Sequence, residues 1–123
     1  MGFPKKILFI DEDYKLSREL AASLNRDRYE ISTTSSNTHG LYLMLNYAYD
    51  MIFLDFNMSE LPGIEVLKKA SSRISRLPIF LFTGKPSIVK LLSNAGLSKF
   101  AKSIIVKPVV VDKFISRIKS FCR

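Results

Sequence analysis

The chain has 123 residues, which is the size of one ordinary domain and too short for two. Hydrophobic residues make up 47% and charged residues 24%, so the composition excludes a disordered or fibrous chain. Nineteen Lys and Arg against eleven Asp and Glu give a net charge of +8, but the basic residues are spread along the chain without a zinc-finger, helix-turn-helix or aromatic-interleaved pattern, which favours a solvated surface over nucleic-acid binding.

Short apolar runs alternate with segments of helical periodicity. In chain order, strands are predicted at Ile7–Ile10, Tyr29–Thr34, Met51–Leu54, Ile79–Phe82 and Ile104–Val106. Apolar residues at helical spacing predict helices across Leu16–Leu24, Leu41–Ala48, Ile64–Ala70, Ile88–Ala95 and Phe114–Cys122. Four of the strand runs are unbroken and apolar, as in strands covered on both faces, whereas Tyr29–Thr34 is more polar and alternates, as at a sheet edge.

This alternation predicts an α/β fold. Parallel strands joined by right-handed helical crossovers are the economical solution, which gives a doubly wound sheet with helices on both faces. In such sheets, ligands bind just beyond the carboxyl ends of the strands.

Polar residues of complementary chemistry follow four of the predicted strands. They are Asp11 and Glu12 after the first strand, Asp55 after the third, Thr83 after the fourth and Lys107 after the fifth. Each residue alone has an ordinary structural explanation, and Asp13 is better explained as the cap of the following helix. Together they predict one site with three carboxylates, a hydroxyl and an ammonium group.

The chemistry of this set is that of phosphoryl transfer. Clustered carboxylates repel one another unless a cation neutralises them, and Mg²⁺ prefers one or two carboxylates with water and phosphate oxygens. A carboxylate can attack phosphorus to form an acyl phosphate, and Lys107 can stabilise the charge of the transferred group. These arguments leave open which acid is the nucleophile.

One answer takes Asp11 as the nucleophile and Asp13 as the acid/base. The stretch "DEDY" then resembles the haloacid dehalogenase phosphohydrolases, over about a dozen residues. This alternative gives Asp55 no role.

The other answer takes Asp55 as the nucleophile. The stretches "KILFIDED", "DMIFLDFNMSELPGIEVLKK", "LPIFLFTG" and "IIVKPV" occur in the order and at the separations typical of one family. With them the chain resembles the receiver domain of two-component response regulators over its full length, residues 1–123. The resemblance implies a flavodoxin-like five-stranded sheet with strand order 2-1-3-4-5.

The resemblance also implies a role for each residue. Asp55 accepts a phosphoryl group from a histidine kinase or phosphotransfer protein, Thr83 binds a phosphoryl oxygen, and Lys107 pairs with the phosphate. The implied Mg²⁺ ligands are Asp11, Glu12, Asp55 and the backbone carbonyl of Asn57. Such a protein switches partner binding, is not a turnover enzyme, and is expected in the cytoplasm without membrane insertion, because neither a secretory signal nor a span of roughly 20 apolar residues occurs.

Two positions depart from the family pattern. Glu12 replaces the commoner aspartate, and Ile104 replaces an aromatic residue that often rotates inward on activation. They keep open a receiver-like scaffold that binds partners without phosphorylation. Receivers commonly dimerise or meet outputs at the face between the fourth and fifth helices. The basic residues in or near it suit either an acidic protein partner or a solvated surface, and a homodimer is the further alternative; they are Lys90, Lys99, Lys102, Lys113 and Arg117.

Overall fold

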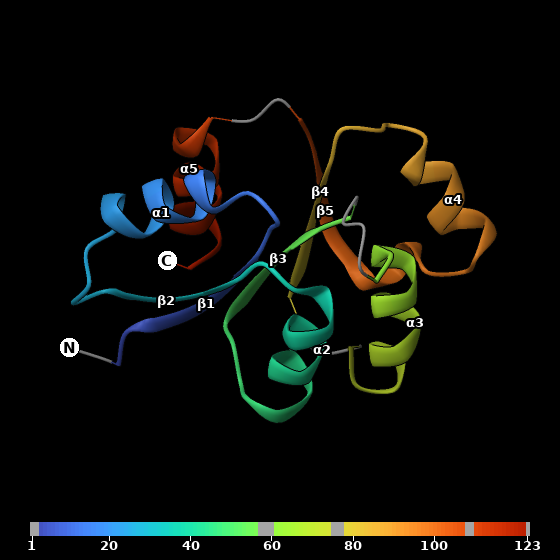
Figure 1. The fold of residues 1–123 in the computed structure, drawn as a ribbon, viewed down its shortest axis with the longest axis horizontal. Helices are drawn as coiled ribbons and strands as arrows, with labels where there is room; N and C mark the ends of the chain where they lie inside the picture. Colours follow the sequence, from blue (N-terminus) through green and yellow to red (C-terminus); the bar gives the residue numbers. More distant parts are fainter. Residues whose placement is uncertain (1–2, 57–60, 75–77, 108–109, 123) are drawn as a thin grey trace.

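The computed structural model describes residues 3–56, 61–74, 78–107 and 110–122 (Figure 1). The strands are β1 (Lys5–Ile10), β2 (Tyr29–Thr34), β3 (Met51–Asp55), β4 (Ile79–Thr83) and β5 (Ala101–Val106). The helices are α1 (Tyr14–Ser23), α2 (Asn37–Asn46), α3 (Gly63–Ile74), α4 (Ile88–Asn94), the short 3₁₀ helix η1 (Ser98–Phe100) and α5 (Val111–Phe121). Strand and helix alternate through the chain, as the sequence predicts.

The five strands form one parallel sheet in the order β2-β1-β3-β4-β5. This confirms the predicted doubly wound α/β fold and places the polar strand β2 at an edge. Helices α1 and α5 cover one face, while α2, α3 and α4 lie on the other (Figure 1). Every residue of β3 and β4 is buried because helices cover both faces there.

Alternate residues of each central strand pack into two hydrophobic cores, one on each face of the sheet. In β1, Leu8 and Ile10 pack toward α2 and α3, whereas Ile7 and Phe9 pack toward α1 and α5. On the face covered by α1 and α5, the ring of Phe114 from α5 meets the rings of Phe9 and Phe53 edge-on, each with a centroid distance of 5.2 Å. This aromatic cluster fixes α5 over the middle of the sheet.

Helix α4 ends earlier than its periodicity predicts. Gly96 has a φ of +70°, its N–H donates to the Ser93 carbonyl, and the N–H of Leu97 donates to the Leu92 carbonyl. This pair of bonds is a Schellman motif, which ends a helix at a residue in the left-handed region. The chain then turns through η1 into β5, which begins at Ala101, three residues before the predicted start.

Four residues of the predicted apolar helix faces are exposed, namely Ala48, Leu91, Ala95 and Phe121. The sequence predicts Leu91 on the core face of α4, but its side chain is 46% exposed, because the short helix contacts the core through Ile88 and Leu92, which are one turn apart. The sequence also predicts Ala48 on the apolar face of the second helix, but α2 stops at Asn46 and Ala48 is exposed.

Gly63 begins α3 and lies against the residue that follows β3. A Cβ atom on Gly63 would stand 2.6 Å from Phe56 Cδ2 and 2.9 Å from the Phe56 backbone. We therefore expect Gly63→Ala to lower the free energy of unfolding by roughly 1–3 kcal/mol through overpacking. Urea unfolding measures the change, with Gly84→Ala as the control because a Cβ there meets nothing within 4 Å. Equal stability of the two variants would contradict this expectation.

Candidate functional site

The carboxyl ends of four strands converge at one edge of the sheet. Asp11 follows β1, Asp55 and Thr83 are the last residues of β3 and β4, and Lys107 follows β5. The strand register aligns these ends through three pairs: Ile10 with Leu54, Asp55 with Phe82, and Thr83 with Val106. The parallel sheet therefore gathers the predicted site residues at the edge where doubly wound folds bind ligands.

Asp55 and Lys107 form an ion pair. Lys107 Nζ lies 3.1 Å from Asp55 Oδ2 and 5.1 Å from the centroid of the Phe82 ring. Asp55 is only 3% exposed, whereas Lys107 is partly exposed. The ammonium group thus stabilises a carboxylate that is largely removed from water.

Asp11 lies beside Asp55 and is 2% exposed. Its Oδ1 accepts a hydrogen bond of 3.1 Å from the backbone N–H of Asp13, and its side chain is hydrogen-bonded to that of Asp55. Burial, and then the neighbouring Asp55, raise the pKa of Asp11 from 3.8 to about 7. The Asp11 carboxyl therefore keeps its proton to a higher pH than an ordinary aspartate does.

Thr83 links the site to the loop after β4. Its side chain is fully buried, and its Oγ1 accepts a hydrogen bond of 3.0 Å from the backbone N–H of Lys85. Its carbonyl accepts a 2.7 Å bond from the backbone N–H of Lys107. Thr83 thereby holds the start of the loop with its side chain and the start of the Lys107 segment with its backbone.

The two remaining predicted metal ligands are placed differently. Glu12 is exposed just beyond β1, and Asn57 lies outside the described residues. Within the described part of the chain, no group of three His, Cys, Asp or Glu side chains gathers as a metal site. The buried pair of Asp11 and Asp55 nevertheless fits Mg²⁺, which takes oxygen ligands and usually only one or two carboxylates from the protein.

Asn37 supports the site and was not found by sequence reasoning. It lies in the first turn of α2, is fully buried, and its Nδ2 donates to the Leu61 carbonyl just before α3. Its Oδ1 has no hydrogen-bond partner among the described residues. Asn37 thus links α2 to Leu61, which lies just before α3 in the connection between β3 and α3. The sequence signal was only a polar residue at a helix start, where a cap or an exposed position is the usual explanation.

Comparison with known proteins shows the family. The family model of the response regulator receiver domain matches residues 7–119, nearly the whole chain. The chain belongs to this family. The match is consistent with two-component signalling, and it confirms the resemblance that the four sequence motifs carry.

Several known proteins are similar to this receiver domain. Response regulator ArlR of Staphylococcus aureus is 30% identical over 118 residues, which are 96% of this chain and 52% of ArlR. This receiver domain therefore spans about half the length of the curated relatives that it matches.

Solved structures share the fold. Response regulator TrrA of Thermotoga maritima, solved in complex with Mg²⁺-BeF, has a TM-score of 0.74 at 24% identity, with 95% of this chain and 98% of TrrA covered. Chemotaxis response regulator CheY4 of Vibrio cholerae has a TM-score of 0.78 at 22% identity, with 96% and 98% covered.

Asp13, which the phosphohydrolase alternative needs as acid/base, has a structural task. It is the N-cap of α1, and its Oδ1 accepts a 2.9 Å hydrogen bond from the N–H of Lys15. This cap accounts for Asp13 without an acid/base role. Separately, the helices of the described segments are all too short or too polar to span a membrane.

The raised pKa of Asp11 predicts a pH-dependent stability. The folded state of the metal-free protein holds this proton more tightly than the unfolded chain, so stability falls as the pH rises from about 4 to about 7. We expect Asp11→Asn, which carries no charge, to become more stable than the wild type by roughly 2–4 kcal/mol across this range. Urea unfolding in EDTA at several pH values measures the gap. Asp112→Asn, at an exposed position on α5, is the control, and a gap that stays constant with pH would contradict the expectation.

The contact of Asn37 with Leu61 predicts a specific effect of an isosteric change. Asn37→Asp replaces the buried donor by an acceptor that faces a carbonyl, which costs about 2–3 kcal/mol of unfolding free energy at pH 7. The deficit relative to the wild type shrinks at low pH, where a protonated carboxyl can donate again. Asn46→Asp is the matched control, because Asn46 Nδ2 also donates to a backbone carbonyl, that of Tyr42, but at an exposed position. Equal losses in the two variants would show that burial of the contact is unimportant.

Proposed function

We propose that this receiver domain accepts a phosphoryl group on Asp55 and thereby switches its binding to a partner. The donor is a histidine kinase or a histidine phosphotransfer protein, and the reaction depends on Mg²⁺. Each molecule accepts one group at a time and undergoes slow self-hydrolysis, so the protein is a switch and not a turnover enzyme. The cytoplasm is the proposed location, because that is where a kinase would supply the phosphoryl group.

The observation that carries the proposal is the environment of Asp55. Its carboxyl is buried at the carboxyl edge of the sheet, with Lys107 at 3.1 Å and Asp11 on its other flank. If the ion pair of Asp55 and Lys107 served stability alone, a second buried acid beside it would only weaken that stability. A site that receives a dianionic group and a divalent cation gains from all three side chains.

The chemistry follows from these positions. A carboxylate oxygen of Asp55 attacks the phosphorus atom of phosphohistidine, the P–O bond forms, the P–N bond breaks, and its electron pair leaves on the imidazole nitrogen. Lys107 already lies within ion-pair distance of Asp55, so its charge moves only slightly to meet a phosphoryl oxygen. The Thr83 hydroxyl can donate to another phosphoryl oxygen.

The metal would be held by Asp11 and Glu12, by Asp55 itself, and by the backbone carbonyl of Asn57. When bound, Mg²⁺ supplies positive charge to the oxygens of the transferred group. Asp11 contributes by giving up its proton to become a ligand. Glu12 is exposed, and its side chain is one methylene longer than that of the commoner aspartate.

Phosphorylation by a small donor tests the proposal. The protein is incubated with acetyl phosphate and Mg²⁺, and its intact mass is measured. We expect a gain of one phosphoryl unit that EDTA prevents and Asp55→Asn abolishes. Asp112→Asn, an exposed aspartate on α5, serves as the matched control and keeps the adduct.

An adduct that survives Asp55→Asn would overturn the assignment of the acceptor. Complete failure of the wild type to form an adduct would favour the alternative scaffold, whose partner affinity does not depend on phosphodonor. Ile104 is the observation behind that alternative, since this half-buried aliphatic residue packs against the core at the position where many receivers carry a rotating aromatic ring.

A further inference from the structure

Exposed aromatic rings form a strip along α2. His39, Tyr42 and Asn46 lie three and four positions apart, so they share one side of the helix, and all three are exposed. Tyr47 is the C-cap residue, and its ring meets that of Tyr42 at a centroid distance of 6.5 Å and an angle of 71°. The ring of His39 stacks on that of Tyr42 at 6.4 Å and 16°. We call His39, Tyr42 and Tyr47 the α2 aromatic strip.

The fold itself does not account for these rings. The side chains of Tyr42 and Tyr47 are 54% and 57% exposed, and neither residue belongs to one of the two hydrophobic cores. Rings that contact one another but stay open to water offer a partner much apolar area at a small entropic cost. Tyrosine is enriched at protein interfaces for this reason.

The strip lies in a part of the chain without basic residues other than His39. Residues 29–65 contain five Asp or Glu and no Lys or Arg, although the whole chain has 19 Lys and Arg. The carbonyl groups at the end of α2 add partial negative charge, and no basic residue in the last turn counters it. The sequence around the strip therefore favours a cation over an anion.

Two exposed acids lie near the end of the strip. Burial, and to a smaller extent Tyr47 and Glu30, raise the pKa of Tyr49, so both residues are close to its hydroxyl. Asp50 follows Tyr49 and is exposed, as is Glu30 on the edge strand β2. Lys6 lies opposite Glu30 in the sheet register and offsets one of the two charges. A negative charge remains beside the rings.

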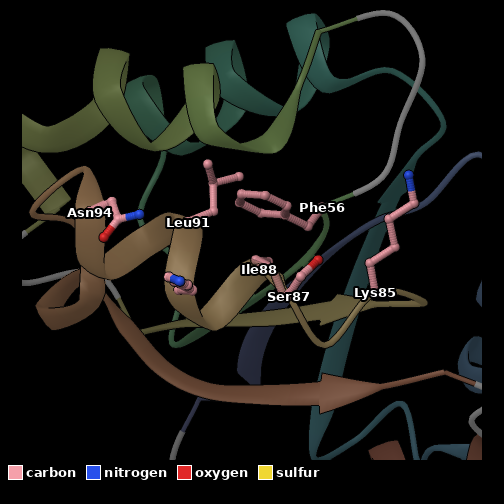
Figure 2. A pocket seen from close by; sticks show the side chains of 7 residues that line it. Phe56, Lys85, Ser87, Ile88, Leu91 and Asn94 are labelled. Atoms are coloured by element: carbon pink, nitrogen blue, oxygen red, sulfur yellow. The ribbon is translucent and has the colours of Figure 1, made fainter.

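The pocket beside α4 has the opposite charge. Its volume is about 350 Å³, and its lining among the described residues includes Lys85 and Lys90 but no acid (Figure 2). Residues 66–123 contain thirteen Lys or Arg and one acid. Helix α3 lies between α2 and α4, so the pocket and the α2 aromatic strip are separate surfaces (Figure 1). The net charge of +8 is thus unevenly distributed, and the surface at α2 is the exception.

We propose that the α2 aromatic strip is a docking site for a basic segment, rich in Arg or Lys, of a partner protein. A guanidinium or ammonium group lies on the face of Tyr42 or Tyr47, because the face of an aromatic ring attracts a cation. A second basic side chain pairs with Glu30 or Asp50. Charge complementarity and the exposed rings together define this partner, and the proposal does not require phosphoryl transfer.

The same features disfavour other occupants. A single-stranded nucleic acid can stack its bases on exposed rings, but its phosphates need Lys or Arg, and residues 29–65 contain none. An acidic peptide is repelled by Glu30 and Asp50. A neutral proline-rich segment also binds exposed aromatic rings, but it gains nothing from the acids. Salt weakens the binding of a basic segment, which separates it from a proline-rich one.

Selection from a random peptide library tests the proposal. Twelve-residue peptides are displayed and selected on the unphosphorylated wild-type chain and, separately, on the double variant Tyr42→Leu/Tyr47→Leu. We expect the wild type alone to enrich peptides with several Arg or Lys. The net charge of +8 repels such peptides from the rest of the surface, so their enrichment reports a local site. Enrichment of proline-rich or acidic peptides instead, or of none, would overturn the proposal.

An enriched, fluorescently labelled peptide then tests the role of the ring. Tyr42→Leu keeps an apolar side chain but removes the ring, whereas Tyr42→Phe keeps the ring. We expect a Kd that is weaker by roughly two- to fivefold for Tyr42→Leu and nearly unchanged for Tyr42→Phe. Phe121→Leu, at a residue of α5 that is 45% exposed, is the matched control for the loss of an exposed ring.

Glu30→Gln tests the acid beside the strip. We expect the Kd to weaken by roughly twofold at low salt and the difference to shrink at high salt. Glu19→Gln, at an exposed position of α1 on the opposite face of the sheet, is the matched control. Equal losses for Glu30→Gln and Glu19→Gln, or for Tyr42→Leu and Phe121→Leu, would show that the peptide does not bind at the strip.

A second copy of this chain is the remaining occupant, because its residues 66–123 are rich in Lys and Arg. Sedimentation velocity of the wild type without peptide distinguishes the two cases. We expect a monomer. A dimer that both Tyr42→Leu and an excess of peptide dissociate would overturn the assignment to a separate partner.

Discussion

The parallel pairing of the central strands β1, β3 and β4 is the constraint on which the other features depend. Because helices cover both faces of the central strands, their buried side chains are apolar from Ile7 onward in β1 and up to the last residue in β3 and β4. The site residues Asp11, Asp55 and Thr83 come at the carboxyl ends of these three strands. The same pairing fixes the lateral order of the side chains, so that Asp55 lies between Asp11 and Lys107.

At this edge of the sheet, ionisable side chains lie close together and are largely buried. Two buried carboxyl groups share one ammonium neighbour that is partly exposed, and the imbalance is expressed in the raised pKa of Asp11. The site is therefore electrostatically incomplete in the absence of added positive charge. The two buried carboxyl groups lower the stability of the fold, but they provide the groups that a ligand needs. This opposition is common where a fold must hold reacting groups.

Sequence reasoning recovered the architecture because the relevant signals are local. Unbroken apolar runs identify strands buried on both faces, and the residues that end them identify the site. The start of β5 was missed because Ala101, Lys102 and Ser103 do not form an apolar run, and their inclusion in the strand depends on pairing with β4. The exposure of Leu91 was missed because periodicity marks one side of a helix but not which of its residues contact the core, and α4 does so through Ile88 and Leu92. The contact between Asn37 and Leu61 joins residues 24 positions apart, which no local pattern reveals.

The hydroxyl of Thr83 has a consequence that extends beyond the site. It accepts the N–H of Lys85, which lies in the loop between β4 and α4. The side chain that borders Asp55 thus also holds the backbone of this loop. Loss of the hydroxyl would leave that backbone N–H without its acceptor, so a substitution at Thr83 would alter the loop as well as the site.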